Sequence, residues 1–268
     1  MGQGARSVTA MVAGLAFSLL PFVAGGIAEA QDRKARLDLG GMSYDFIPPE
    51  DLCPVELDHA SLALPVRQYL FARTVKTQFD EGLGLVLWLA DCDWLRRVDN
   101  LEYFYGPFFP ARMMVLSVPV RPNGQFGTMG SMSREAYIDR LDASNDETSW
   151  PASDAEALAT MANIVATAPA SDEPRTVPTV LLARRERERD VVYVADLKAH
   201  RTTPSRTGGQ GEPYWQVSAA FNAITVLGDF PLVLQNRDLV DDGLPADRLQ
   251  SELQAVLRQL RSQDDGRR

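Results

Sequence analysis

The clearest pattern of apolar and polar positions lies at residues 214–236, where two apolar segments flank Gly228 and Asp229. Glycine supplies the positive φ that two-residue turns require, so this pattern predicts two antiparallel strands joined by a tight turn. The turn places Leu227 opposite Phe230 and gathers apolar side chains on one face of the hairpin. The other face is apolar near the turn and more polar away from it, which predicts partial cover by a helix.

The residues next to this turn predict its surroundings. Pro231 has no backbone N–H to donate, which predicts that its strand lies at an edge of the sheet. An amphipathic helix from about Ala246 to Ser262 follows directly, and Pro245 marks its start. We expect this helix to cover the partly polar face of the hairpin and residues 263–268 to form a tail.

Three further apolar segments predict strands. Residues 42–46 alternate between apolar and polar side chains and end at a Pro-Pro pair, whereas residues 83–90 are apolar on both faces, as in a central strand. Strict alternation in 83–90 places its four leucines on one face and Val86 and Trp88 on the other. The third strand is predicted at 113–120.

A second hairpin is predicted from residues 177–184 and 191–199. Its tip, residues 185–190, consists of alternating charges, which we expect to be solvated. A contact with a partner is the alternative for this tip.

Three segments have the apolar period of a helix, at residues 64–78, 133–141 and 153–166. The last of them begins with a capping box of Ser153 and Glu156. Its expected buried stripe is Leu158, Met161, Ala162 and Val165.

The order of these segments predicts an α+β fold. We expect a mainly antiparallel sheet packed against helices, with a helical insertion at about residues 131–168 and a C-terminal covering helix. A chain of this length can bury one sizeable core, so residues 42–262 are expected to form a single domain.

Residues 1–30 have the pattern of a signal peptide. A basic residue precedes an apolar run from Val8 to Val23, and Ala28-Glu29-Ala30 has the small residues that signal peptidase requires. We predict cleavage before Gln31 and a flexible leader over residues 31–41. A retained membrane anchor is the alternative, because the apolar run is nearly long enough to span a bilayer.

The charge of the chain limits its partners. The formal net charge of −9 argues against nucleic acid and anionic lipid as general partners, because both repel an acidic surface. With the leader cleaved, we expect a periplasmic or secreted protein without stable membrane insertion.

Cys53 and Cys92 are the only cysteines in the sequence. An even number of cysteines in an exported protein favours a disulfide. A bridge across about forty residues would stabilise the fold by ~4 kcal/mol on the chain-entropy account. A metal site or a redox pair is the alternative, but the spacing matches neither a CxxC motif nor a zinc cluster, and only His59 and His200 are available to help.

No stretch matches a P-loop, a dinucleotide-binding fingerprint, a nucleophile elbow or an HExxH motif. We therefore predict no cofactor and no metal, and we assign no catalytic residue. Asp91 and Asp93 flank Cys92 and act either as paired carboxylates or as a helix cap and a surface acid. The densest aromatic group either packs in the core or forms a ligand or partner surface. It consists of Tyr103, Phe104, Tyr105, Phe108 and Phe109.

Two stretches of the chain resemble known proteins. YDFIPPEDLC at 44–53 and ITVLGDFPLVLQNR at 224–237, followed by the helix ADRLQSELQAVLRQL, are similar to PsbP-like proteins, in which an antiparallel sheet lies between helices. The segment at 44–53 and the C-terminal helix also resemble those of exported proteobacterial proteins. These proteins pair a cysteine after Pro-Pro with a second cysteine in an Ala-Asp-Cys step, which here is Ala90 to Cys92. The resemblance implies an accessory role and transfers no catalytic residue.

These patterns favour a non-enzymatic accessory or binding protein of the cell envelope, with another envelope protein as its partner. A periplasmic hydrolase that uses carboxylates near an aromatic-lined pocket is the alternative, and an envelope-anchored structural protein is a third hypothesis. A pocket that joins Asp91, Asp93 or His200 to the aromatic group would favour the hydrolase.

Overall fold

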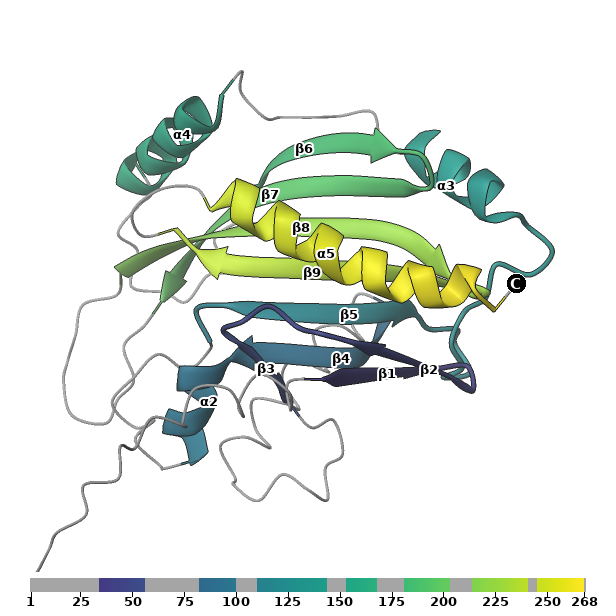
Figure 1. The fold of residues 1–268 in the computed structure, drawn as a ribbon. Coiled ribbons are helices and arrows are strands. Elements are labelled where there is room, and N and C mark those ends of the chain that lie inside the picture. The colour runs from purple at the N-terminus through teal and green to yellow at the C-terminus, as the bar shows by residue number, and fades with distance from the viewer. Residues whose placement is uncertain are drawn as a thin grey trace, which may run out of the picture. The chain divides into compact units, whose positions relative to one another are not determined.

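The described part of the chain consists of two antiparallel sheets and the helices that pack on them (Figure 1). The computed structural model describes residues 34–55, 82–99, 110–143, 153–167, 181–202, 214–240 and 245–267. The strands are β1 (Ala35–Leu39), β2 (Met42–Phe46), β3 (Leu52–Val55), β4 (Leu83–Asp91), β5 (Met113–Pro119), β6 (Leu181–Glu188), β7 (Val191–Thr202), β8 (Tyr214–Leu227) and β9 (Phe230–Leu239). The helices are α2 (Cys92–Asp99), α3 (Arg134–Ala143), α4 (Asp154–Thr167) and α5 (Ala246–Asp265).

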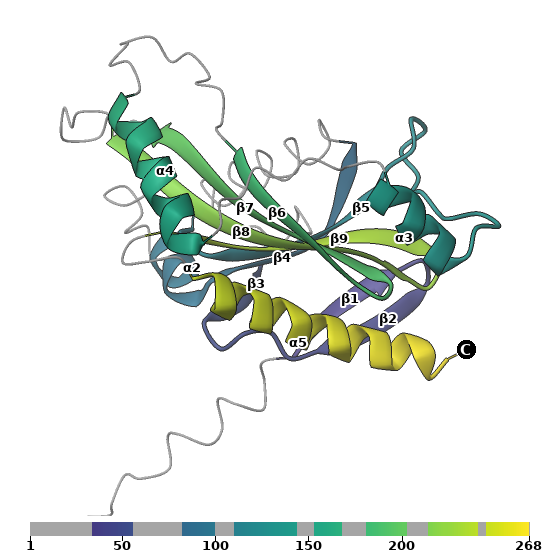
Figure 2. The same cartoon turned by 90° about the horizontal axis from the view of Figure 1, so that it is seen from above.

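The larger sheet has seven strands in the order β3-β4-β5-β9-β8-β7-β6, and every neighbouring pair is antiparallel. The smaller sheet pairs β1 with β2. Helix α5 runs across one face of the larger sheet, and β1 and β2 lie on the same side (Figure 1, Figure 2). The α+β fold predicted from the sequence, with its C-terminal covering helix, is therefore confirmed.

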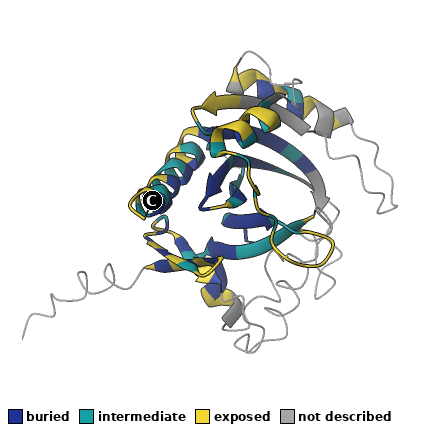
Figure 3. Ribbon diagram, turned by 90° about the vertical axis from the view of Figure 1, so that its right-hand side faces the viewer, coloured by how far each residue is buried: buried dark blue, intermediate teal, exposed yellow. Residues whose placement is uncertain are grey.

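The main hydrophobic core lies between the larger sheet and these covering elements. Each strand contributes alternate side chains to it, such as Phe221 on β8 and Leu234 on β9. Helix α5 contributes one stripe of its surface, which consists of Leu249, Leu253, Val256, Leu257 and Leu260. Figure 3 shows the buried residues on the strands and on the side of α5 that faces them. Tertiary packing of this stripe holds α5 in place, since an isolated helix in water is marginally stable.

The hairpin of β8 and β9 has the predicted register. Leu227 pairs with Phe230, and Gly228 in the turn has a φ of 58°. The prediction that Pro231 marks a sheet edge is wrong, because β9 lies in the middle of the sheet between β8 and β5. The pairing of β9 with β5 ends at Val233, so Pro231 lies beyond that ladder, where its missing N–H is not needed.

Helix α5 covers the opposite face of this hairpin from the one predicted. It packs on the apolar face, which carries Phe221, and Asn236 Nδ2 donates a hydrogen bond to the backbone oxygen of Leu249 on the helix. The partly polar face, which carries Asn222 and Gln235, points away from α5. The apolar stripe of the helix buries more apolar area against this more apolar face, and this burial favours the observed side.

An irregularity in β4 changes which of its side chains enter the core. Its register to β5 shifts between Leu85 and Leu87, so the prediction that all four leucines share a face is wrong. Leu87 and Leu89 pack in the main core, whereas Leu85 packs with Trp88 on the opposite face. An extra residue in one strand inverts the alternation of the residues beyond it, which explains the change.

The fold begins earlier and ends later than the sequence predicts. The expected flexible leader, residues 31–41, instead includes β1, whose inward side chains are buried. The expected tail, residues 263–268, instead includes the last turn of α5 and the buried Asp264. Pairing with β2 orders the first segment, and polar contacts of Asp264 order the second.

The predicted insertion contains α3 and α4, which lie near opposite ends of the β6–β7 hairpin (Figure 1, Figure 2). Each begins with a serine side chain that accepts a hydrogen bond from a backbone N–H three residues on, Ser133 for α3 and Ser153 for α4. The buried side of α4 carries Ala157 and Met161. Ala162, which was expected in this stripe, is exposed.

Residues 186–189 at the charged tip of the β6–β7 hairpin are exposed, as predicted, and the tip also belongs to an ion network. The strands extend into the charged segment, and the turn itself is Arg189-Asp190, with a φ of 52° at Arg189. Arg187 pairs with Asp139 on α3, and Asp190 accepts hydrogen bonds from Arg261 on α5 at 2.5 and 2.6 Å. Charges from two helices therefore hold this turn.

Some predicted elements lie outside the described residues. These are the signal peptide at 1–30 and the helix at 64–78. Residues Lys34–Arg268 form one unit. Among the helices that the structure describes, none has the length and apolar character needed to cross a membrane.

Candidate functional site

The face of the larger sheet that points away from α5 carries a pocket among polar side chains. The pocket has a volume of about 230 Å³, and five adjacent strands, β4, β5, β9, β8 and β7, contribute to its lining. We call it the sheet-face pocket, and its described lining residues are Leu83, Val115, Ser117, Asp196, Lys198, Asn222, Val233 and Gln235. Strand alternation places these side chains on one face, and the irregularity in β4 brings Leu83 to that face as well.

Asp196 is a buried carboxylate in the wall of this pocket, with a side chain only 7% exposed. Its Oδ2 accepts a hydrogen bond from Asn222 Nδ2 at 2.6 Å. Its Oδ1 accepts none from the described residues, and Lys198 Nζ lies 3.8 Å from it. Burial raises the pKa of this carboxyl above its ordinary value, and the charges of Lys198 and Arg237 and the Asn222 hydrogen bond offset that effect only in part.

Asn222 holds the polar groups of the pocket in position. Its Nδ2 donates to Asp196 and, at 3.1 Å, to the backbone oxygen of Val194, while its Oδ1 accepts from Gln235 Nε2 at 2.8 Å. Gln235 lies directly opposite Asn222 in the β8–β9 ladder. Both amide hydrogens of Asn222 are thus used, and the chain of hydrogen bonds orients the Asp196 carboxylate.

A second cation, Arg237, lies in the same cross-strand row as Asp196, on the same face. The register places Arg237 opposite Ala220, and Ala220 opposite Asp196. Burial lowers the pKa of the Arg237 guanidinium, and the charge of Asp196 counters part of that effect. The small Ala220 side chain separates the two charged groups, so this face combines one carboxylate with the cations of Arg237 and Lys198.

Similarity to known proteins adds nothing to this description of the pocket. No protein family matches the chain, and no curated protein matches it either. The chemistry of the sheet-face pocket therefore follows from its own side chains.

We expect Asp196→Asn to raise the stability of the protein at pH 7 and to have less effect near pH 4. A carboxyl whose pKa rises on folding is harder to ionise in the folded state, so the wild type loses stability as the pH rises above the unfolded-state pKa of about 4. Asparagine has no charge to bury and its oxygen still accepts from Asn222. Urea unfolding of both proteins at the two pH values measures the effect, and an equal difference at both would contradict it.

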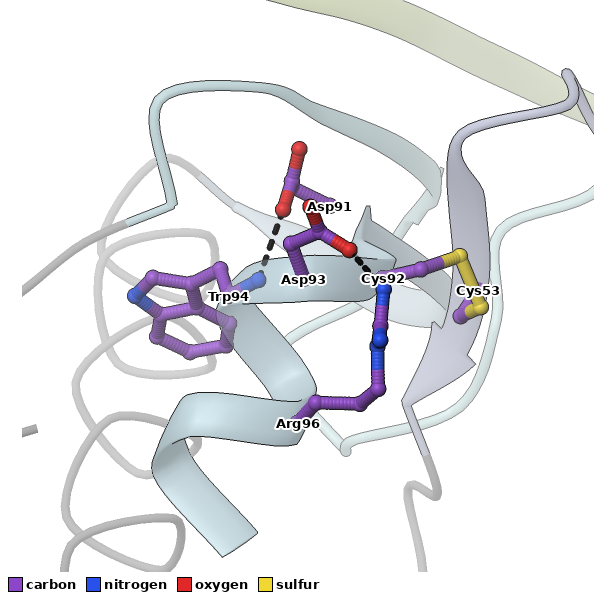
Figure 4. The surroundings of a disulfide bond; sticks show 6 residues. All are labelled: Cys53, Asp91, Cys92, Asp93, Trp94 and Arg96. Atoms are coloured by element: carbon purple, nitrogen blue, oxygen red, sulfur yellow. Dashed lines mark hydrogen bonds and ion pairs between the residues drawn. A yellow bond between two sulfur atoms is a disulfide. The ribbon is translucent and has the colours of Figure 1, made fainter. Parts of the chain in front are cut away.

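Cys53 and Cys92 form the predicted disulfide (Figure 4). Cys53 lies on β3 opposite Ala90 of β4, and Cys92 is the first residue of α2. The bridge therefore ties the outer strand of the larger sheet to the start of a helix. Since the two sulfur atoms are bonded to each other, the alternative of a metal site made by these thiols does not apply to this structure.

Asp91 and Asp93 both contribute to the first turn of α2. Asp91 Oδ1 accepts a hydrogen bond from Trp94 N at 2.6 Å, and Asp93 pairs with Arg96 (Figure 4). The Asp93 side chain is 70% exposed. Asp91 is therefore a helix cap and Asp93 a surface acid, and the alternative of paired carboxylates does not describe their contacts. Neither residue lines the sheet-face pocket.

We expect Asp91→Ala to lower the free energy of unfolding by about 1 kcal/mol, because the backbone N–H of Trp94 loses its capping oxygen. Asp93→Ala is the matched control and should have little effect, since its ion pair is exposed to solvent. Urea unfolding of the two variants measures both changes. Equal losses in the two variants would contradict the assignment of Asp91 as the cap.

The remaining sequence candidates lie outside what the structure describes. They are the aromatic group at 103–109, the residue His59 and the side chain of His200. The residues of the sheet-face pocket, in turn, were not predicted as a site. The sequence gives little indication of this site, because Asp196 and Asn222 are each a single polar residue within an otherwise apolar segment. Only the register of β7 with β8 shows that these two interruptions are neighbours.

Proposed function

We propose that the protein is a non-enzymatic accessory or binding protein of the cell envelope, and that its ligand binds in the sheet-face pocket. The Asp196 carboxylate carries this proposal, because its buried Oδ1 accepts no hydrogen bond from the described residues. A buried charged oxygen without a hydrogen bond destabilises a fold, and the ion pair of Asp196 with Lys198 offsets this cost only in part. Such costs concentrate where a ligand uses the group, which makes the pocket the best-supported site.

An oxidising compartment is part of the same proposal. The Cys53–Cys92 disulfide supports it, because disulfides persist in the periplasm and outside the cell and are rare in the cytosol. The leader pattern at 1–30 supports export. The resemblance to PsbP-like proteins supports an accessory role, and we propose another envelope protein as the partner.

We expect the protein isolated from the periplasmic fraction of its source cells to begin at Gln31. Signal peptidase recognises the small residues Ala28 and Ala30 and cleaves after Ala30, which removes the apolar run before it. Intact-mass measurement of the purified protein identifies its first residue. A protein that retains Met1 and sediments with the membrane would support the anchored alternative instead.

The binding proposal is tested by the small molecules that co-purify with the protein. The tagged chain is isolated from its source cells and denatured, and mass spectrometry identifies what it releases. The matched variants are Asp196→Asn in the pocket and Asp45→Asn on β2, where the side chain is 54% exposed and pairs with Arg36. We expect one compound to be enriched with the wild type and with Asp45→Asn and to be lost with Asp196→Asn.

Two outcomes would overturn this proposal. A wild-type protein that releases no compound dependent on Asp196 would remove the pocket as a ligand site. Conversion of the released compound by the purified protein, with loss of that conversion in Asp196→Asn, would replace the binding protein with an enzyme, for which the hydrolase is the alternative to test.

A further inference from the structure

The sheet-face pocket offers hydrogen-bond acceptors and donors side by side. Asp196 Oδ1 is an acceptor in its wall, and Lys198 Nζ is a donor beside it. Gln235 donates one of its two amide hydrogens to Asn222, so its other amide hydrogen and its carbonyl oxygen remain for a ligand. Asn222 itself is occupied, because both its amide hydrogens and its oxygen bind protein groups. The pocket therefore offers a ligand both hydrogen-bond acceptors and hydrogen-bond donors.

Asp196 and Lys198 form an ion pair that one further polar group can bridge from the side. Their Oδ1 and Nζ atoms are 3.8 Å apart, which is longer than the roughly 2.7–3.2 Å of a direct hydrogen bond. One oxygen atom to the side of the pair, about 2.8 Å from each atom, can form a hydrogen bond to both. A hydroxyl group does so with complementary polarity, because it accepts from the ammonium and donates to the carboxylate.

Charge disfavours the other simple ligands. An ammonium ligand would bind Asp196 but would be repelled by Lys198 and by Arg237, which lies in the same cross-strand row as Asp196. A carboxylate ligand would bind Lys198 but would be repelled by the ionised Asp196. A neutral hydroxyl meets both side chains without either repulsion, and the amide of Gln235 can bind a second hydroxyl in the same way.

The remaining lining sets the size and the other surface of the ligand. Leu83, Val115 and Val233 are apolar and can contact C–H groups. A volume of about 230 Å³ lies below the roughly 300–1,000 Å³ of pockets for drug-sized ligands. We propose that the ligand is a small polyhydroxylated molecule, such as a single sugar ring or a polyol, with one hydroxyl between Asp196 Oδ1 and Lys198 Nζ. This inference rests on the proposed function and adds the class of ligand.

Titrations monitored by NMR test this class directly. The purified protein is titrated with glycerol, myo-inositol, D-glucose and D-ribose, and with acetate and ethylammonium as charged probes. We expect at least one polyol to cause saturable shifts at the backbone amides of Asp196, Asn222 and Gln235. Acetate and ethylammonium should cause no saturable shifts there.

Matched variants locate the binding groups. Asp196→Asn and Lys198→Met should each weaken polyol binding by about tenfold or more, as expected for the loss of a hydrogen bond to a charged group. Their controls are Asp45→Asn and Lys34→Met, which change exposed residues of the same types outside the pocket and should leave the affinity unchanged. NMR spectra of each variant establish that it is folded before titration.

The outcomes separate this inference from the proposed function. Saturable binding of acetate or ethylammonium at these amides, with no polyol binding, would overturn the polyol class and leave the pocket as a binding site. Polyol binding that the two pocket variants do not weaken would overturn the position between Asp196 and Lys198. The absence of saturable shifts with all four polyols would overturn the inference, whereas the co-purification experiment decides the proposed function independently.

Discussion

Asp264→Ala is expected to lower the free energy of unfolding by about 3–5 kcal/mol, because it breaks a buried ion pair with Arg134 and removes the acceptor of three hydrogen bonds. Asp264 is 2% exposed and lies in the last turn of α5. Its Oδ2 accepts a hydrogen bond from Arg134 on α3 at 2.6 Å. Its Oδ1 accepts from Gly228 N at 3.0 Å and from the Tyr44 hydroxyl at 3.3 Å. One carboxylate therefore joins α5 to α3, to the β8–β9 turn and to β2.

Urea denaturation at pH 7 measures this loss, and the next residue in the chain supplies the control. Asp265 also lies near Arg134, at 3.7 Å, but its side chain is 63% exposed. Asp265→Ala should therefore change stability little, since exposed ion pairs contribute little. Asp264→Asn keeps an acceptor for Gly228 and should fall between wild type and alanine. Equal losses at 264 and 265 would show that burial does not determine the contribution.

Removal of the disulfide is the second large effect that we expect. Cys53 and Cys92 are separated by 39 positions, and release of a loop of this length costs about 4 kcal/mol on the chain-entropy account. The double variant Cys53→Ala/Cys92→Ala should therefore unfold at a markedly lower urea concentration than the oxidised wild type. The loss arises mainly because the reduced chain has more conformations in its unfolded state.

The reductant provides the control for the disulfide. Reduced wild type should have a stability close to that of the double variant, and added reductant should leave the double variant unchanged. Thiol labelling of the unfolded, unreduced wild type should detect no free thiol. A double variant as stable as the oxidised wild type would show that the bridge contributes nothing to the folded state.

The successful sequence predictions concern contacts between near neighbours in the chain. The register of β8 with β9 follows from Gly228, because a two-residue turn determines every pair beyond it. The serine cap of α4 and the aspartate cap of α2 are also local, since each joins groups three residues apart. Such features depend on backbone geometry that the local sequence controls.

The unsuccessful predictions concern contacts between distant segments. The missing N–H of Pro231 predicts an edge strand, but β5 pairs with residues 233–237 of the same strand. Alternation in β4 was extended through a register shift that depends on its partner strand. The ion network of Asp190 and Asp264 joins helices to turns that are far apart in the chain. None of these pairings has a local signal.

By itself, the sequence determined the α+β class, most of the strands and helices, the capping residues and the disulfide partners of this protein. These follow from periodicity, turn chemistry and cysteine number. Only the tertiary structure decided which face α5 covers, and thereby which face retains Asp196, Lys198, Asn222 and Gln235 as a pocket. Three consecutive strands, β7, β8 and β9, supply these four side chains, and their pairing in the sheet, driven by burial of the opposite face, brings them together.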